Sequence, residues 1–393
     1  MSSEPYSTGY CTNVHAGATL ETMRANLERH ALAVKQRYSP DRPMGVGLWL
    51  SAKAAEELLL NHGEREFAEW LADRGLVPYT LNGFPFGDFH QEIVKYRVYE
   101  PTWWQPERLH YTMQLAQIHD AILPPGMEGS ISTLPIAWGA PCPDRAELEQ
   151  AALQLRQAAQ WLHQLEKESG RLIYVCLEPE PGCYFTFADD AVHFFQWQLF
   201  GHEDEEIVRR HVRICHDICH AAVMFEDQEE VLAKYAAAGM HVGKVQVSAA
   251  LLMDLDLFEP PADRERAAAV KQLSQFAEDR YLHQTVVHRG KDDVFYDDLR
   301  PALDAEANDP RGQWRVHFHM PIYLKEFGRL RATQEQIEQC LAAMRKHSNC
   351  QHYEVETYAW GVLPAELKQP ELAAGIAEEL KWFQKLQASG AGE

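Results

Sequence analysis

The stretch Val212-Arg-Ile-Cys-His-Asp-Ile-Cys-His220 decides the fold of this chain. Residues 212–215 have the character of a short buried strand, and that strand leads directly to Asp217 and His220, which can bind a divalent cation or move a proton. In α/β barrels the ends of the strands carry the chemistry, so this stretch predicts one strand of a metal-dependent barrel. The alternative is structural: Asp217 caps a helix that begins near Ala221, and the neighbouring histidines have no chemical role.

Segments of strand character alternate along the chain with segments of helical period, as in a parallel sheet covered by helices. Apolar runs predict strands over 9–15, 44–50, 76–82, 129–135, 172–177, 212–215 and 242–247. Apolar residues spaced by three and four predict helices between them, over 20–34, 52–70, 107–122, 144–162 and 227–238.

Three more strand-like runs follow at 283–288, 315–322 and 352–358, where an eight-stranded barrel has room for one. We take 352–358 as the eighth strand. The sequence therefore predicts one domain over 1–393, a (β/α)8 TIM barrel with an insertion at about 260–330 on its C-terminal catalytic face.

The charge and the cysteines limit the class of protein. The chain has 37 basic and 58 acidic residues and a formal net charge of −21, so no broad positive field attracts nucleic acid. The start of the chain lacks the basic and apolar regions of a signal peptide, and no apolar run has transmembrane length. We expect a cytoplasmic protein without a transmembrane segment, whose 8 scattered cysteines are reduced thiols.

Pairs of polar residues recur near the C-terminal ends of the predicted strands. Side chains two residues apart on a strand share a face. The pairs are Asn13 with His15, Glu178 with Glu180, His317 with His319, and Glu354 with Glu356. A buried, unpaired carboxylate costs several kcal/mol, so the acidic pairs imply a cation, a ligand or open solvent. We favour a cation at Glu178 and Glu356 over salt-bridged or solvated carboxylates at the rim.

The order Glu178, Asp217-x-x-His220, a polar residue on the next strand and Glu356 resembles the xylose isomerase-like TIM-barrel superfamily of sugar isomerases, epimerases and endonuclease IV-type enzymes. The resemblance implies that Glu178, Asp217 and Glu356 bind a metal ion and that His220 is a substrate-binding or fourth-shell group. As a mechanistic hypothesis, we expect Glu178 and Glu356 to be catalytic as well. Where the superfamily usually has a histidine ligand, this chain has Gln246, which the resemblance makes the fourth metal candidate.

The identity of the metal depends on which side chains complete the site. Three carboxylates and the amide oxygen of Gln246 form a hard oxygen site that favours manganese or magnesium. Zinc is favoured if His317 or His319 completes the shell. The loop over 84–104 is long and rich in aromatic residues, which is typical of functional loops. The candidates for binding substrate are Asn13, His15, Asn82, His90, Glu180, His220, His317 and His319.

Six longer motifs resemble the EboE-type metabolite-traffic proteins and span nearly the whole chain. They are GYCTNVH at 9–15, NGFPF at 82–86, ISTLP at 131–135, EPEPG at 178–182, CHDICH at 215–220 and HFHMP at 317–321. The resemblance implies a barrel that handles or exports a small metabolite together with membrane-associated partners, and it implies no demonstrated reaction.

Three functions follow from these observations. The first is a metal-dependent isomerase or epimerase acting on a polyhydroxylated, sugar-like metabolite, in which the two glutamates move a carbon-bound proton. The second is a non-catalytic metabolite-binding or carrier protein on the same barrel, which the glutamine at 246 favours. The third, an endonuclease IV-like phosphodiesterase, shares the Asp-x-x-His pattern but conflicts with the negative charge.

Overall fold

The computed structural model of this chain describes residues 8–60, 62–258, 263–367 and 371–389. The first seven residues, on which part of the argument against a signal peptide rests, lie outside the described residues, as does the start of the predicted insertion at about 260. Within the described parts of the chain, no helix combines the length and the apolar content needed to cross a membrane.

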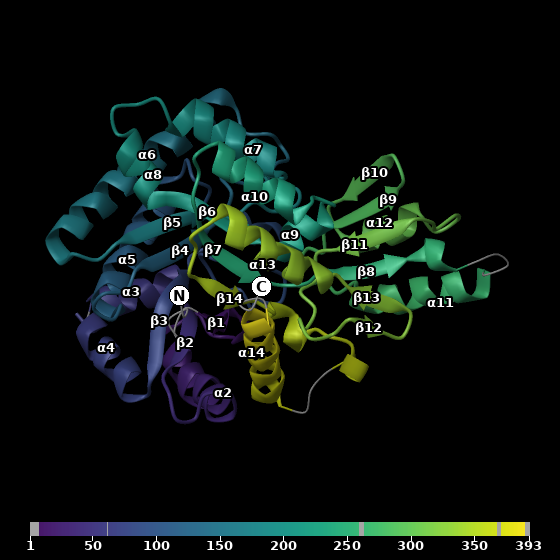
Figure 1. Cartoon of the computed structure of the whole chain (residues 1–393), viewed down its shortest axis with the longest axis horizontal. Helices are drawn as coiled ribbons and strands as arrows, with labels where there is room; N and C mark the ends of the chain where they lie inside the picture. Colours follow the sequence, from purple (N-terminus) through teal and green to yellow (C-terminus); the bar gives the residue numbers. More distant parts are fainter. Residues whose placement is uncertain (1–7, 61, 259–262, 368–370, 390–393) are drawn as a thin grey trace.

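Eight parallel strands close into a barrel, in the order β1-β14-β7-β6-β5-β4-β3-β2 (Figure 1). The strands are β1 (Thr8–Cys11), β2 (Met44–Trp49), β3 (Leu76–Asn82), β4 (Gly129–Thr133), β5 (Ile173–Leu177), β6 (Val212–Asp217), β7 (Val242–Val247) and β14 (Tyr353–Val355). Every residue of β2, β3, β4, β5 and β7 is buried, as expected for strands covered on both faces. The predicted (β/α)8 barrel is confirmed.

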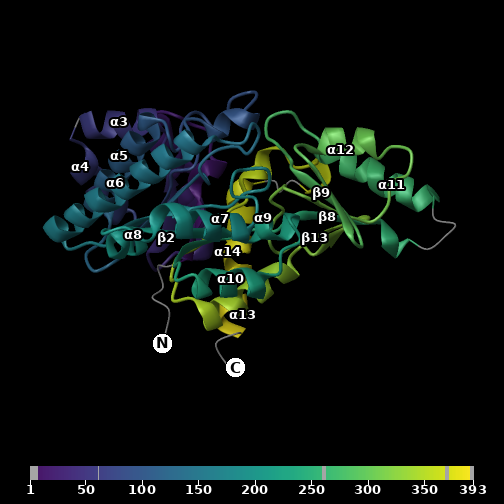
Figure 2. The ribbon, with the colours of Figure 1, turned by 90° about the horizontal axis from the view of Figure 1, so that it is seen from above.

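Helices surround the barrel between its strands (Figure 2). They are α1 (Leu20–Asn26), α2 (Leu32–Tyr38), α3 (Ala52–Leu60), α4 (Glu64–Asp73), α5 (Pro106–Ile122), α6 (Arg145–Ser169), α7 (Ala188–Phe194), α8 (Glu205–His211), α9 (Ile218–Val223), α10 (Gln228–Ala237), α13 (Glu335–His347) and α14 (Leu372–Ser389). Helix α6 has a clear signal at each end. Asp144 accepts from the Glu147 amide at 2.9 Å, and Gly170 adopts a positive φ of 76° directly after the helix.

Between β7 and β14 the chain leaves the barrel and builds a second sheet of six antiparallel strands, in the order β10-β9-β11-β8-β13-β12. Its elements are β8 (Leu251–Asp254), α11 (Asp263–Leu273), β9 (Thr285–Arg289), β10 (Asp292–Tyr296), α12 (Leu299–Ala305), β11 (Gln313–Val316), β12 (Glu326–Phe327) and β13 (Leu330–Ala332). Figures 1 and 2 show this inserted sheet beside the barrel, with α11 and α12 packed along it. Because the insertion leaves from the C-terminal end of β7, it lies on the face where the strands end.

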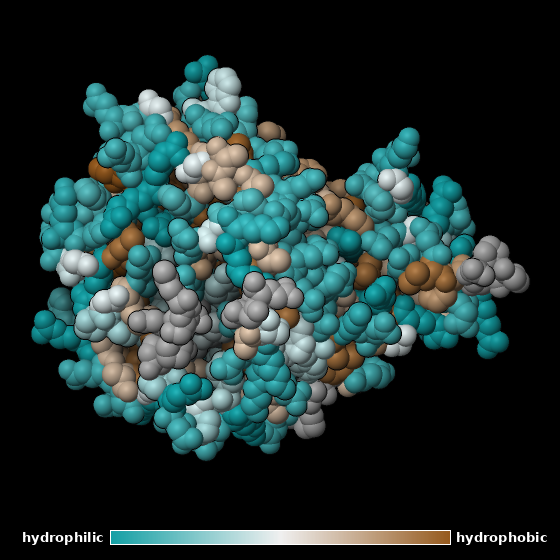
Figure 3. Space-filling view, in the orientation of Figure 1, coloured by the Kyte–Doolittle hydropathy of each residue, from teal (hydrophilic) through white to brown (hydrophobic). Residues whose placement is uncertain are grey.

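The visible surface is mainly hydrophilic, which agrees with the 24% of charged residues in the sequence. Figure 3 shows a face covered mainly by hydrophilic side chains, with small scattered apolar areas. Most of the buried apolar residues of the barrel and of the inserted sheet form one continuous core, which includes Val245 of β7 and Trp314 of β11. The inserted sheet is therefore packed onto the barrel and can hold side chains in fixed positions at its mouth.

Candidate metal and substrate site

The ends of three barrel strands bring three carboxylates together. Glu178 follows β5 directly, Asp217 is the last residue of β6, and Glu356 follows β14 directly. One oxygen of each carboxylate lies within 4.8 Å of the others, and all three side chains are buried. Since β5, β6 and β14 are far apart in sequence, only the closed barrel creates this cluster.

The two carboxylate oxygens of Asp217 have different roles, since one caps a helix and the other belongs to the carboxylate cluster. Its Oδ1 accepts hydrogen bonds from the Ser248 hydroxyl at 2.7 Å and from the His220 amide at 3.0 Å. This second bond makes Asp217 the N-cap of α9, so the helix begins at Ile218 and the expected start near Ala221 was wrong. The other oxygen, Oδ2, is buried without a hydrogen-bond partner in the described structure. The helix-cap and metal-ligand interpretations are therefore compatible.

Three histidine rings lie beside the cluster, and the hydrogen-bond partner of each ring determines which of its nitrogens carries the hydrogen. Each Nδ1 faces a carbonyl oxygen: His220 that of Pro179 (2.9 Å), His317 that of the Gln284 side chain (2.8 Å), and His319 that of Glu356 (2.7 Å). A carbonyl can only accept, so each Nδ1 carries the hydrogen and each neutral ring keeps a free electron pair on Nε2. This is the arrangement of histidines that bind metals.

The Nε2 atoms of the three rings converge. Those of His220 and His319 each lie 3.8 Å from Asp217 Oδ2, and those of His220 and His317 lie 3.2 Å apart. Two ligand atoms on a tetrahedral zinc ion with bonds of about 2.0–2.1 Å lie about 3.3 Å apart. Burial lowers the pKa of His319 to about 4, and burial followed by the neighbouring histidines lowers that of His317 well below its usual value. Both rings are therefore neutral near pH 7.

Gln246 lies inside the barrel on β7, paired in register with Asp217 on one side and Glu354 on the other. Both polar atoms of its amide are buried without a hydrogen-bond partner in the described structure. Two residues earlier on the same strand, Lys244 forms a fully buried ion pair with Glu354 at 2.6 Å. The barrel interior therefore carries charged and polar groups below the carboxylate cluster.

The carboxylates influence one another's ionisation. Burial, and then the charges of Glu356 and Asp217, raise the pKa of Glu178 well above its usual value. Burial and the charge of Asp217 raise the pKa of Glu356 to about 8. Burial also opposes the ionisation of Asp217, but the His220 and His319 rings and the Ser248 hydroxyl keep its pKa below its usual value. Protons occupy part of this cluster at neutral pH unless a cation replaces them.

These residues fit a divalent cation. Four ligand-type atoms are buried and lack a hydrogen-bond partner among the described residues: Glu178 Oε2, Asp217 Oδ2, Gln246 Oε1 and His319 Nε2. Oxygens alone suit magnesium or manganese, and the imidazole adds a donor that zinc prefers. The inserted segment thus supplies His319 to the site, whereas β7 supplies Gln246.

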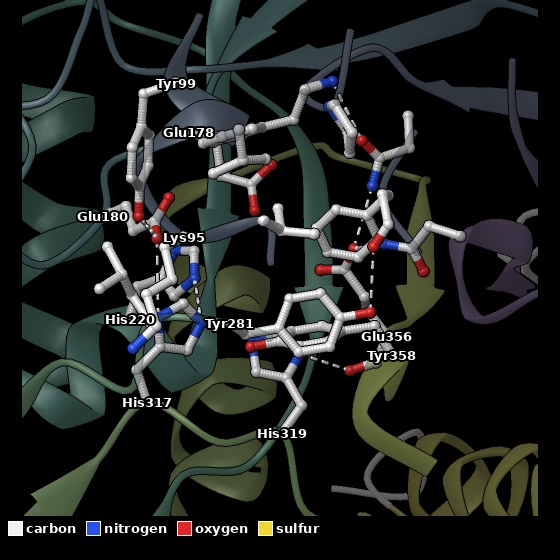
Figure 4. Close-up of a pocket in the computed structure, with 18 residues that line it drawn as sticks. Lys95, Tyr99, Glu178, Glu180, His220, Tyr281, His317, His319, Glu356 and Tyr358 are labelled. Carbon is white, nitrogen blue, oxygen red and sulfur yellow. Dashed lines mark hydrogen bonds and ion pairs between the residues drawn. The ribbon is translucent and has the colours of Figure 1, made fainter. Parts of the chain in front are cut away.

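A cavity opens beside the cluster (Figure 4). Eight of the residues predicted from the sequence line it: Asn13, Asn82, Glu178, Glu180, His220, His317, His319 and Glu356. The amides of Asn13 and Asn82 both donate to Glu356 Oε1, at 2.7 and 3.0 Å, and fix the orientation of that carboxylate. Asp217 and Gln246 are not among the lining residues of this cavity.

The structure does not bring His15 or His90 to the cavity wall. Strand β1 ends at Cys11 and residues 12–14 form a 3-10 turn, so Asn13 and His15 do not share a strand face. The His15 ring instead bonds the Tyr10 hydroxyl at 3.0 Å and stacks on His30. His90 bonds the backbone carbonyl of Asn13 at 2.6 Å and so supports a lining residue from behind.

Sequence reasoning missed two parts of the site. Glu180 accepts hydrogen bonds from the Tyr99 hydroxyl at 2.7 Å and from the Gln284 amide at 2.9 Å, so the inserted segment holds this carboxylate. The aromatic rings of Tyr281 and Tyr358 also line the cavity. The aromatic content of loop 84–104 was the available signal for Tyr99, and no spacing in the sequence linked it to the inserted residues.

Comparison with known proteins supports the fold. No protein-family model and no curated protein sequence matches the chain. Among solved structures, a xylose isomerase-like TIM barrel protein from Mycobacterium smegmatis in complex with magnesium is 11% identical, with 99% of each chain covered and a TM-score of 0.53. The chain shares the TIM-barrel fold of this protein. The predicted (β/α)8 barrel fold is thereby confirmed.

Two further solved structures are similar over most of their length. The 3-keto-D-glucoside 4-epimerase YcjR from E. coli is 15% identical, with 97% of this chain and 99% of that chain covered and a TM-score of 0.43. The IOLI protein with a binding zinc atom is 12% identical, with 98% of each chain covered and a TM-score of 0.47.

Proposed function

We propose that this protein is a divalent-metal-dependent isomerase or epimerase that acts on a small, oxygen-rich, sugar-like metabolite. The observation that carries the proposal is the pair of buried carboxylates Glu178 and Glu356, which line one cavity and share a ligand cluster with Asp217. The Mycobacterium smegmatis barrel of the same fold is in complex with magnesium, which supports a divalent cation in the proposal.

The chain's own residues have separate tasks in this proposal. Glu178, Asp217 and Glu356 would hold the cation, and Gln246 or His319 would complete the shell. When bound, the cation would supply Lewis-acid polarisation of a substrate carbonyl and a neighbouring hydroxyl. Glu356, fixed through Oε1 by two asparagine amides, and Glu178, whose Oε2 has no partner in the described structure, then exchange a carbon-bound proton with the substrate.

The alternative is a binding or carrier protein that keeps the cation and lacks turnover. The decisive experiment incubates the metal-loaded protein with a panel of ketoses, aldoses and their phosphates in D2O and follows deuterium entering carbon positions by NMR. An enzyme of the proposed type exchanges a proton next to a carbonyl, and Glu178→Gln and Glu356→Gln abolish the exchange. Binding of a panel member without exchange would favour the carrier.

The resemblance to EboE-type proteins adds a cellular proposal. It places the reaction or binding step in metabolite traffic or export, in the cytoplasm and next to membrane-associated partners. Affinity capture of the tagged full-length protein from a detergent-solubilised membrane fraction tests this. Recovery of defined membrane proteins that depends on the folded barrel would support the proposal, and recovery of soluble proteins alone would count against it.

A further inference from the structure

The cavity beside the carboxylates has two chemically different sides. One side carries the oxygen and nitrogen donors described above, including Glu178, His319 and Glu356. The other side is carbon-rich and is formed by Phe84, Pro85, Phe89, Val94, Val98, Tyr99, Tyr281, Leu282 and Tyr358. We call this second set the apolar wall. It joins three parts of the chain: the loop after β3, the inserted segment before β9, and the turn after β14.

Three rings form the centre of the apolar wall. Tyr281 lies 5.0 Å from both Phe89 and Tyr358, and Phe89 lies 5.6 Å from Tyr358, measured between ring centroids. Tyr358 also contacts the His319 ring at 4.7 Å, so the apolar wall continues directly into the metal-binding side. In Figure 4 the rings of Tyr281 and Tyr358 lie between the labelled histidines and Glu356. An aromatic surface of this kind suits a flat apolar group.

Two of the three tyrosine hydroxyls in the apolar wall are already paired within the protein. The Tyr281 hydroxyl donates to the Phe89 carbonyl at 3.2 Å, and the Tyr99 hydroxyl donates to Glu180 at 2.7 Å. The Lys95 ammonium at the edge of the wall pairs with Asp298 at 2.5 Å. A substrate body with a hydroxyl on each carbon would lose its water here and find few partners in return, which is unfavourable.

We propose, building on the function proposed above, that the substrate is amphipathic. Its head carries adjacent carbonyl and hydroxyl oxygens, which lie at Glu178 and Glu356. Its body is apolar and flat, and it packs against Phe89, Tyr281 and Tyr358. The substrate thus joins a sugar-like hydroxy-carbonyl head to an aromatic, cyclic or unsaturated hydrocarbon part, and it is not a free hexose.

Three hydroxamates test the inference because they chelate a divalent cation through the same two oxygens and differ only in the body. Acetohydroxamate has a methyl group, benzohydroxamate a phenyl ring, and gluconohydroxamate a polyhydroxylated chain. Binding is measured by titration calorimetry on the full chain, reconstituted separately with Mn²⁺ and Zn²⁺. We expect benzohydroxamate to bind about tenfold to a hundredfold more tightly than acetohydroxamate, since the phenyl ring becomes buried. Gluconohydroxamate should bind no more tightly than acetohydroxamate.

Substitutions in the apolar wall test whether the wall causes the preference for benzohydroxamate. Phe89→Ser should remove most of the advantage of benzohydroxamate over acetohydroxamate. Tyr281→Leu is the second variant should Phe89→Ser fail to fold. Phe187→Ser, which alters a phenylalanine that is 41% exposed and not among the lining residues of the cavity, is the matched control and should keep the full preference.

The possible failures are distinguishable. Gluconohydroxamate binding as tightly as benzohydroxamate, or all three binding equally, overturns the amphipathic substrate and leaves the metal site intact. A preference for benzohydroxamate that survives both wall variants also overturns it. If no hydroxamate binds with either metal, the proposed function falls, and this inference falls with it.

Discussion

Replacing Asp217 with asparagine separates the two uses of this carboxylate. Asparagine retains the oxygen that accepts from Ser248 at 2.7 Å and from the His220 amide at 3.0 Å, so the cap of α9 persists. It replaces Oδ2 by an NH2 group, which points hydrogens at the position of the cation. Asparagine and aspartate are equivalent N-caps, and the change also relieves repulsion with Glu178 and Glu356. We therefore expect the metal-free variant to unfold within about 1 kcal/mol of the metal-free parent.

The metal-loaded proteins should differ much more. At a free metal concentration of about 100 times its dissociation constant, binding stabilises the parent by about 2.7 kcal/mol, and Asp217→Asn should lose all of this. The assay combines elemental analysis of metal per chain with thermal unfolding in the presence of metal and of chelator. Asp217→Ala removes the cap as well and should lose about 1 kcal/mol more, even without metal.

Asp227→Asn is the matched control for this substitution. Asp227 caps α10 in the same way, accepting from the Glu230 amide at 3.0 Å, but it lies on the exposed surface and outside the carboxylate cluster. This variant should keep the metal content and the metal-dependent stabilisation of the parent. An Asp217→Asn protein that retained a full equivalent of metal and the same rise in melting temperature would refute the assignment of Asp217 as a ligand.

Three other predictions follow from the charges in the barrel. First, because burial raises the pKa of Glu356 to about 8 in the metal-free protein, a cation must displace a proton there. Metal affinity should then rise with pH up to about 8, and below that pH it should fall about tenfold per pH unit for each proton displaced. Calorimetry in buffers of different ionisation enthalpy measures the number of protons released on metal binding. Glu356→Gln should release one proton fewer than the parent. Second, His319→Asn should weaken zinc binding more than manganese binding, since zinc prefers the imidazole, and equal losses for both metals would contradict this. Third, Lys244→Met leaves Glu354 buried without its partner and should lower the free energy of unfolding by about 3–5 kcal/mol in denaturant titrations. The double variant Lys244→Met/Glu354→Leu should recover most of that loss.

The barrel could be predicted from the sequence because its strands are apolar runs bounded by polar residues. The predicted bounds of β3 and β7 agree with the structure at both ends, at 76–82 and 242–247. β14 was harder, since only Tyr353–Val355 pair as strand within the run predicted over 352–358. In a closed parallel barrel the strand ends meet at one rim, so the approach of Glu178, Asp217 and Glu356 to one another follows from the fold itself.

The rest of the site depends on contacts that sequence periodicity does not contain. The 3-10 turn after β1 interrupts the strand period and turns His15 away from Asn13. His319 reaches Asp217 only because the inserted sheet packs on the barrel and a carbonyl of residue 356 fixes its ring. The apolar wall likewise joins Phe89 to Tyr281, and such pairs arise from tertiary packing between distant segments.

The charge inside the barrel gives the strongest argument that a cation belongs there. Four carboxylates, those of Glu178, Asp217, Glu354 and Glu356, are buried close to a single ammonium, that of Lys244. Fully ionised, this group carries a net charge of −3, which a low-dielectric interior does not tolerate. Protonation can reduce it, and the raised pKa values of Glu178 and Glu356 show the direction of that response. A divalent cation reduces it to −1 without protons, and the unpartnered atoms of Gln246 and His319 then become ligands or hydrogen-bond partners at its side. Lys244 alone cannot balance the site, because its ammonium is already paired with Glu354. The residues whose polar atoms lack partners in the described parts of the chain are therefore those that a metal ion and its substrate would engage.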